Sequence, residues 1–183
     1  MPRTARLTRD DWARAALAAL AEGGPAAVAV EPVAARLGAS KSSFYWLFDG
    51  RPALLSAALE RWERVQTDEI LPWLAAIADP AERLRVLMRH AFAAAESGDL
   101  ALRLLGETDD PLVRDVVERV TKRRIAVIEA AFEEMGHAGA RHYAEASYAA
   151  YLGTAALRRV DAAPADADAY IGALLTAFGI EFG

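Results

Sequence analysis

The spacing of apolar residues along the 183-residue chain predicts helices almost throughout. Apolar positions recur at intervals of three and four, strong helix formers dominate, and runs of β-branched residues are scarce. No segment has the alternating pattern of a strand. We therefore expect an all-α fold, with helices over residues 9–22, 32–37, 41–48, 51–77, 80–97, 99–107, 110–135, 138–161 and 166–181.

Residues that start and stop helices set the ends of these segments, and the segments group into a head and a body. Thr8 and Asp11 have the spacing of a capping box, and Gly38 can take the left-handed conformation that ends a helix. The helix over 51–77 is long, and we expect Pro72 to kink it near its end. We predict a small three-helix head, residues 1–50, joined by this long helix to a larger helical body, residues 51–183.

The segment from Val33 to Tyr45 has the pattern of a helix-turn-helix, in which the second helix enters the major groove of DNA. Ser40 caps the second helix. Phe44 and Phe48 are four residues apart, so they lie on one face of this helix, which we expect to be buried. The main-chain amides at its start, with the hydroxyls of two serines, can bind phosphate oxygens. The opposite, DNA-facing side carries polar and aromatic groups: Lys41, Ser42, Tyr45 and Trp46. The second serine is Ser43.

Composition narrows the classes of protein. Cysteine is absent, which excludes disulfides, thiolate zinc sites and cysteine nucleophiles, and we expect a cytoplasmic protein without a signal peptide or membrane span. A net charge of −5 argues against a nucleic-acid partner. The charge is uneven, however: residues 1–64 carry nine Lys and Arg against seven Asp and Glu, whereas the rest carries twelve against nineteen. A DNA-binding head on an acidic body fits this distribution.

Catalytic and cofactor motifs are missing from the sequence. It contains no phosphate-binding loop, no nucleophile elbow and no dinucleotide fingerprint. His137 and His142 are five residues apart, a spacing that does not place two imidazoles on one helical face. We therefore expect no enzyme activity, no cofactor and no metal.

The N-terminal residues resemble the tetracycline-repressor (TetR) family of bacterial regulators. The resemblance rests on Trp12-x-x-Ala15-Ala16-Leu17, Gly24, Val33-Ala34, Gly38-x-Ser40, Phe44-Tyr45-x-x-Phe48 and Arg51-x-x-Leu54-Leu55, and covers about residues 8–60. It implies a homodimer in which three N-terminal helices bind operator DNA and a fourth leads to a ligand-binding body. The last two helices would form the dimer's four-helix bundle.

The resemblance also implies roles for individual residues. Lys41, Ser42 and Trp46 would face DNA, whereas Ser43, Tyr45 and Arg51 would contact phosphate. The chain departs from the family at several positions: Ala29 and Leu47 replace a usual hydroxyl and a frequent histidine, Ser42-Ser43 replaces Gly-Thr, and Arg51 replaces lysine.

Two further groups of residues are candidates for function in the body. Apolar and aromatic side chains that could converge on a small-molecule effector, with His90 as a polar anchor, are Trp62, Trp73, Met88, His90, Phe92 and Tyr148. Large residues between small ones on the last two helices suit a two-fold dimer interface: Tyr143, Ser147, Tyr151, Thr154, Leu157, Tyr170, Leu174 and Ala177. For both groups the alternative is packing in the core of the same chain.

These observations predict a transcription regulator, a repressor by the family's commoner habit, that a small and mainly apolar molecule releases from its operator. The alternative is a helical small-molecule-binding or scaffold protein whose helix-turn-helix is unused, which the acidic average charge favours.

Overall fold

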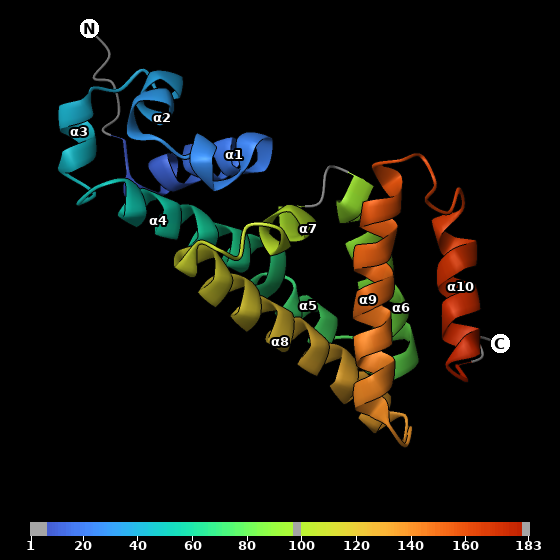
Figure 1. Cartoon of the computed structure of the whole chain (residues 1–183). Helices are drawn as coiled ribbons and strands as arrows, with labels where there is room; N and C mark the ends of the chain where they lie inside the picture. The colour runs from blue at the N-terminus through green and yellow to red at the C-terminus, as the bar shows by residue number, and fades with distance from the viewer. Residues whose placement is uncertain (1–6, 97–99, 181–183) are drawn as a thin grey trace, which may run out of the picture. The chain divides into compact units, whose positions relative to one another are not determined.

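The computed structural model describes residues 7–96 and 100–180, and in that part of the chain helices alternate with turns and no strand forms (Figure 1). This confirms the all-α prediction. The predicted helix ends at residues 97, 99 and 181 lie outside the described residues. None of the described helices is both long and apolar enough to cross a membrane.

The described residues form two compact units. The first comprises residues 7–67 and 103–117, and the second comprises residues 68–96, 100–102 and 118–180. The predicted boundary at residue 50 divides the chain by expected function, whereas the two units are defined by contacts within the chain. That boundary stays a prediction.

In the first unit, α1 packs along α4 and also contacts α2, which in turn contacts α3. The core between them is apolar and fully enclosed: Trp12, Leu20, Val33, Phe44, Leu54, Leu55 and Leu59 are each 0% exposed. These helices are α1 (Arg9–Ala27), α2 (Val30–Arg36), α3 (Lys41–Tyr45) and α4 (Arg51–Glu63).

Helix α1 begins and breaks where the sequence predicts. The Thr8 hydroxyl accepts from the Asp11 amide at 3.2 Å, and the Asp11 carboxylate accepts from the Thr8 amide at 2.9 Å, so the capping box is complete. Gly24 interrupts the helix with φ of 71°, a left-handed conformation that only glycine adopts easily. A short helical turn then continues to Ala27.

The single helix predicted over 51–77 is wrong. Helix α4 ends at Glu63 and passes into a π-helical turn, η1 (Arg64–Asp68), and a separate helix α5 (Leu71–Ala75) follows. A proline ring clashes with the carbonyl four residues earlier, here that of Asp68, and proline has no main-chain N–H to donate. The chain therefore breaks before Pro72, which lies in the first turn of α5.

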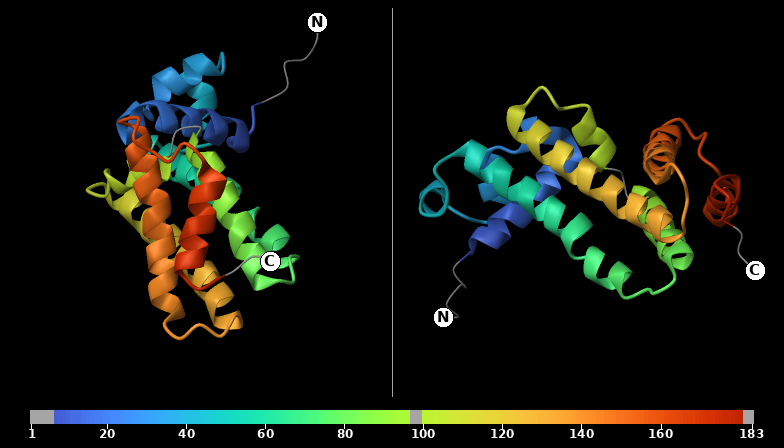
Figure 2. Two further views of the ribbon diagram at one scale, coloured as in Figure 1. Left: turned by 90° about the vertical axis from the view of Figure 1, so that its right-hand side faces the viewer. Right: turned by 90° about the horizontal axis from the view of Figure 1, so that it is seen from below.

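The second unit is built around α6 (Pro80–Glu96), which packs against α9 (Ala140–Arg158), α10 (Ala167–Ala177) and α5. Figure 2 shows α9 in orange and α10 in red running alongside α6 in green. Helix α7 (Leu100–Leu105) and helix α8 (Pro111–Glu134) each contribute residues to both units. The core of the second unit is rich in aromatic and aliphatic groups, among them Leu84, Met88, Phe92, Phe132, Tyr148, Ile171 and Leu175.

An arginine at the start of α6 holds that helix to α8. Arg83 makes two hydrogen bonds to the Glu134 carboxylate, at 2.8 and 3.0 Å, and also donates to the Ile77 carbonyl at 2.9 Å. The paired guanidinium lowers the pKa of Glu134 below its usual value.

Candidate nucleic-acid interface

Helices α2 and α3 are joined by the tight turn of a helix-turn-helix (Figure 1). Gly38 has φ of 59°, and the Ala39 amide donates to the Ala34 carbonyl at 2.9 Å, closing the end of α2 as the sequence predicts. Ala29 occupies the N-cap position of α2 and provides no side-chain cap, because alanine has no hydroxyl.

Helix α3 is only five residues long and depends on its cap. The Ser40 hydroxyl accepts from the Ser43 amide at 3.2 Å, and the Ser43 hydroxyl donates to the Ser40 carbonyl at 2.6 Å. Ser42 and Ser40 hydroxyls lie 2.9 Å apart. In free protein these serines therefore bond within the turn, and a phosphate oxygen would have to replace those partners.

The two faces of α3 differ sharply in exposure. Phe44 and Phe48 are 0% and 2% exposed, and their rings stack at 5.3 Å, which confirms that this face is buried. Phe44 also contacts the Trp12 ring at 5.3 Å. On the other face Tyr45 is 62% and Trp46 79% exposed. The structure thus displays the two aromatic side chains that the sequence assigns to DNA.

Every described lysine and arginine up to residue 64 has a partner within the first unit. Lys41 forms an ion pair with Glu31 of α2, which raises the pKa of Lys41 and lowers that of Glu31. Arg36 pairs with Glu22 in the same way. Phosphate binding by this surface would therefore exchange carboxylate partners for phosphate rather than neutralise free cations.

Arg51 lies at the first position of α4 and donates to the Pro25 carbonyl at 2.6 Å. That bond holds the start of α4 against the break in α1. A guanidinium has five N–H donors, so one bond to a carbonyl leaves donors for a phosphate. The predicted role of Arg51 is compatible with this geometry and stays a prediction.

Five of the six predicted ligand residues lie in the second unit, where they fall into two groups. Met88, Phe92 and Tyr148 lie together in the core of the second unit, where their side chains fill the space. Trp73 and His90 form a separate pair, with ring centroids 6.0 Å apart, and both are exposed. Trp62 is buried in the first unit.

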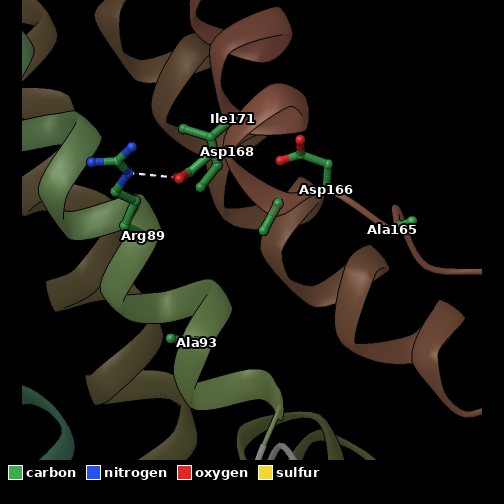
Figure 3. Close-up of a pocket in the computed structure, with 7 residues that line it drawn as sticks. Arg89, Ala93, Ala165, Asp166, Asp168 and Ile171 are labelled. Carbon is green, nitrogen blue, oxygen red and sulfur yellow. Dashed lines mark hydrogen bonds and ion pairs between the residues drawn. The ribbon is translucent and has the colours of Figure 1, made fainter.

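A surface pocket of about 620 Å³ lies elsewhere in the second unit, between α6 and the start of α10 (Figure 3). Arg89 of α6 donates to Asp168 of α10 at 2.5 Å across it, and Ile171 lines its apolar side. Sequence analysis missed this pocket because Arg89 and Asp168 are 79 positions apart and no local pattern joins them.

The predicted dimer residues mostly face the core of their own chain. Ser147 and Thr154 are 2% and 3% exposed, and the Ser147 hydroxyl donates to the Tyr143 carbonyl at 2.8 Å. Tyr143, Tyr151, Tyr170 and Leu174 are partly buried against the same core. For these six residues the structure favours the alternative of packing within the chain, while Leu157 and Ala177 are exposed.

The exposed face of α9 carries small and aliphatic residues, of which Leu157 was already a predicted dimer residue. These residues follow a spacing of three and four: Ala146, Ala149, Gly153, Ala156 and Leu157. On α10 the corresponding exposed residues are Ala169, Ala173, Thr176 and Ala177. The small size of these residues was the available signal, but only the fold distinguishes this face from the buried one.

Neither candidate histidine lies in a metal site. His137 packs edge-on against Phe132 and Tyr143, at 5.5 and 5.6 Å, and His142 is exposed beside Glu145. Across the described residues no three His, Cys, Asp or Glu side chains gather closely enough to hold a metal ion.

Comparison with known proteins adds a family match. The family described as "Bacterial regulatory proteins, tetR family" matches residues 13–58, the segment that contains α2, α3 and the exposed aromatics. No curated protein matches the chain in sequence.

Solved structures match the fold over nearly the whole chain. The E. coli NemR protein in its reduced form has a TM-score of 0.78 at 18% identity, covering 91% of this chain and 96% of its own. A TetR-family transcriptional regulator from Cytophaga hutchinsonii has a TM-score of 0.73 at 17% identity, covering 96% and 95%. The Bacillus subtilis regulator FadR, solved with stearoyl-CoA, has a TM-score of 0.73 at 14% identity, covering 95% and 100%.

Proposed function

We propose that this chain, whose residues 13–58 match the tetR family of bacterial regulatory proteins, is a cytoplasmic repressor that binds operator DNA as a homodimer and leaves it when a small, mainly apolar molecule binds. The observation that carries the proposal is the exposure of Tyr45 and Trp46 on a capped helix whose opposite face is buried. Large apolar side chains held in water on a rigid helix are typical of a binding surface.

Each head would place α3 in a major groove. Lys41 and Ser42 lie in the first turn of α3, nearest the base edges, and Tyr45 and Trp46 follow one turn later. Arg51, Ser43 and Tyr45 would contact the phosphate backbone beside the groove. Because Lys41 is already paired with Glu31, binding requires that DNA offer it a better partner than this exposed carboxylate.

The exposed faces of α9 and α10 would form the dimer interface. Their small residues allow a partner helix to approach closely, and a two-fold axis would bring the same faces of two chains together. Leu157 and Ala177, which the sequence selected, belong to this surface. Two heads held in this way would read half-sites about 34–36 Å apart, or a multiple of that distance.

The effector would bind in the second unit. Its core is apolar and aromatic, and the exposed Trp73 and His90 pair adds a ring surface with a polar edge. The stearoyl-CoA bound by the Bacillus subtilis neighbour supports an apolar ligand for this fold. Ligand binding must favour the DNA-free state by about 1–3 kcal/mol to weaken operator binding 5- to 150-fold.

The decisive experiment measures binding of purified protein to tiled DNA fragments from the flanks of its own gene, by fluorescence anisotropy at two salt concentrations. We expect tight, salt-sensitive binding to one short palindromic fragment. The Trp46→Ala variant should lose that binding, whereas Trp73→Ala, an exposed tryptophan of the second unit, should keep it.

Uniform weak binding to every fragment, unchanged by Trp46→Ala, would contradict the proposal. It would favour the alternative of a helical ligand-binding or scaffold protein. Effector binding is tested separately, by adding long-chain fatty acids and their acyl-CoA esters to the DNA complex and measuring its dissociation. Quenching of Trp73 fluorescence by the same compounds in the absence of DNA would locate the site, with Trp73→Phe as the control.

A further inference from the structure

The first turn of α1 contacts the turn after α3 and also α4, and the proposed function does not use these contacts. Arg9 donates from its guanidinium to the Leu47 carbonyl at 2.8 Å, and its central carbon lies 4.3 Å from the centre of the Phe48 ring. The next residue, Asp10, accepts hydrogen bonds from Arg61 and Arg64, the latter at 3.0 Å. Adjacent residues thus join α1 to the turn that follows α3 and to α4.

The contact made by Arg9 lies two residues beyond the end of α3. A helix of five residues cannot form stably by itself, since helix nucleation is unfavourable. Its first turn has the Ser40 cap, but the last carbonyls of a helix have no partners within it. Arg9 donates to the Leu47 carbonyl just past this end, and its positive charge there is favoured by the helix dipole. The cation also lies over an aromatic face, which adds to the attraction.

The base from which Arg9 reaches is itself held in place. Thr8 and Asp11 form the capping box that sets the direction of the first turn of α1. The two arginines on Asp10 hold its carboxylate in the charged form and lower its pKa. The chain before Leu47 consists of Tyr45 and Trp46, the exposed aromatics of the DNA-facing surface. Any shift of the Leu47 carbonyl therefore moves both rings.

We propose that Arg9 is a positioning residue of the DNA-binding surface: its bond to the Leu47 carbonyl and its contact with Phe48 fix the orientation of Tyr45 and Trp46. This inference rests on the proposed function for its effect on DNA, but the contact itself is a property of the free protein. Arg9 acts through α3 and does not touch DNA. Asp10 holds the same turn to α4, so α4 and α3 share one anchor.

Hydrogen exchange in the DNA-free protein tests the inference without any operator. In Arg9→Met we expect the amides of residues 44–48 to exchange about tenfold faster, because the charged hydrogen bond and the cation–π contact are lost. The matched control is Arg14→Met: Arg14 lies on the same helix, and its side chain is 63% exposed and pairs with Asp11 in its own turn. It should leave these amides unchanged. Unchanged exchange in Arg9→Met would overturn the inference.

Salt dependence distinguishes positioning from phosphate contact. On the fragment that binds wild-type protein, Arg9→Met should weaken binding about tenfold with the slope of log K against log salt unchanged. A phosphate contact would instead lower that slope by about 0.9 for each head, and this result with unchanged exchange would overturn the inference.

Arg9→Lys, which keeps a cation over Phe48, should restore most of the protection and binding. If Arg9→Met does not fold by circular dichroism, Arg9→Lys against Arg14→Lys provides the same comparison, with a smaller expected loss. If wild-type protein binds no fragment, that result counts against the proposed function alone. Hydrogen exchange in Arg9→Met still tests the inference that Arg9 positions the DNA-facing surface.

Discussion

The exposed face of α3 carries large side chains, whereas the exposed face of α9 carries small ones. Helix α3 displays two of the largest residues, Tyr45 and Trp46, whereas α9 displays Ala146, Ala149 and Gly153. Both helices bury aromatic groups on their other side, Phe44 in one and Tyr148 in the other. The two helices therefore differ in the size of their exposed side chains and resemble each other on their buried side.

The contrast in size corresponds to a contrast in what each face can approach. Long, rigid side chains reach into a groove whose walls keep the helix backbone at a distance. Small residues let another helix pack with its axis only about 8–10 Å away. A DNA contact on α3 and a helix contact on α9 are thus the partners that the two faces suit best. Substitutions that change the size of each face test this interpretation.

The largest expected effect comes from removing the long side chains of α3. The double variant Lys41→Ala/Tyr45→Ala should weaken operator binding by a factor on the order of 100 or more, since each lost base or phosphate contact costs about 1–3 kcal/mol. Anisotropy titrations measure the loss. Tyr45→Phe keeps the ring and removes only the hydroxyl, so it separates the share of the proposed phosphate contact from that of the ring. Wild-type affinity in the folded double variant would show that α3 does not bind DNA.

Enlarging the small face of α9 should have the next largest effect. A Cβ added to Gly153 meets no atom of its own chain within 4 Å, and leucine favours a helix over glycine, so Gly153→Leu should leave the subunit folded. Overpacking between subunits costs about 1–3 kcal/mol, which raises the dimer dissociation constant 5- to 150-fold. Sedimentation velocity measures this constant. The control is Ala126→Leu on the exposed side of α8, and an equal effect of both variants would place the interface elsewhere.

Releasing Lys41 from Glu31 should have a smaller effect, of the opposite sign. Glu31→Gln removes the carboxylate that pairs with Lys41, and exposed pairs contribute about 0.2–1 kcal/mol, so operator affinity should rise by up to about fivefold per head. Glu22→Gln, which releases Arg36 on the same surface, serves for comparison. Weaker binding of Glu31→Gln would indicate that the carboxylate itself contacts a base.

The smallest expected effect is that of acid on stability. The pKa values of Asp10 and Glu31 are lowered chiefly by hydrogen bonds from Arg64 and Lys41, and that of Asp11 by the Thr8 amide. A lowered pKa in the folded state stabilises the protein above the usual carboxyl pKa of about 4, and this contribution is lost as the pH falls through the folded-state value. The melting temperature should therefore drop below about pH 4. The drop should shrink at high salt, because these groups are exposed. A drop that is independent of salt would implicate buried groups instead.

Local features of α3 could be read from sequence because neighbouring residues decide them. A serine cap depends on Ser40 and the amide three residues later, and burial of Phe44 and Phe48 follows from the helical period. The turn at Gly38 likewise needs one residue able to adopt positive φ. These predictions were confirmed at the level of single residues.

Neighbouring residues alone do not decide the course of the chain over residues 51–77 or the faces that the helices of the body expose. Pro72 indicates a break, but whether the chain kinks at the proline or stops before it depends on how η1 and α5 pack. On α9 both faces have helical spacing, one with Ser147 and Thr154 and the other with Ala149 and Gly153. Periodicity identifies two candidate faces without deciding which one turns inward.

The sequence by itself determined the class of fold, the capped α3 and the identity of its exposed aromatic side chains, because these depend on contacts within a few residues. Only the tertiary structure decided that Arg9 meets Leu47 across 38 positions, that Lys41 is paired with Glu31, and that α9 turns its tyrosines inward. The physical reason is that long-range pairing depends on which surfaces the packed helices bring together. Many arrangements satisfy the same local pattern, and burial of the aromatic core selects among them.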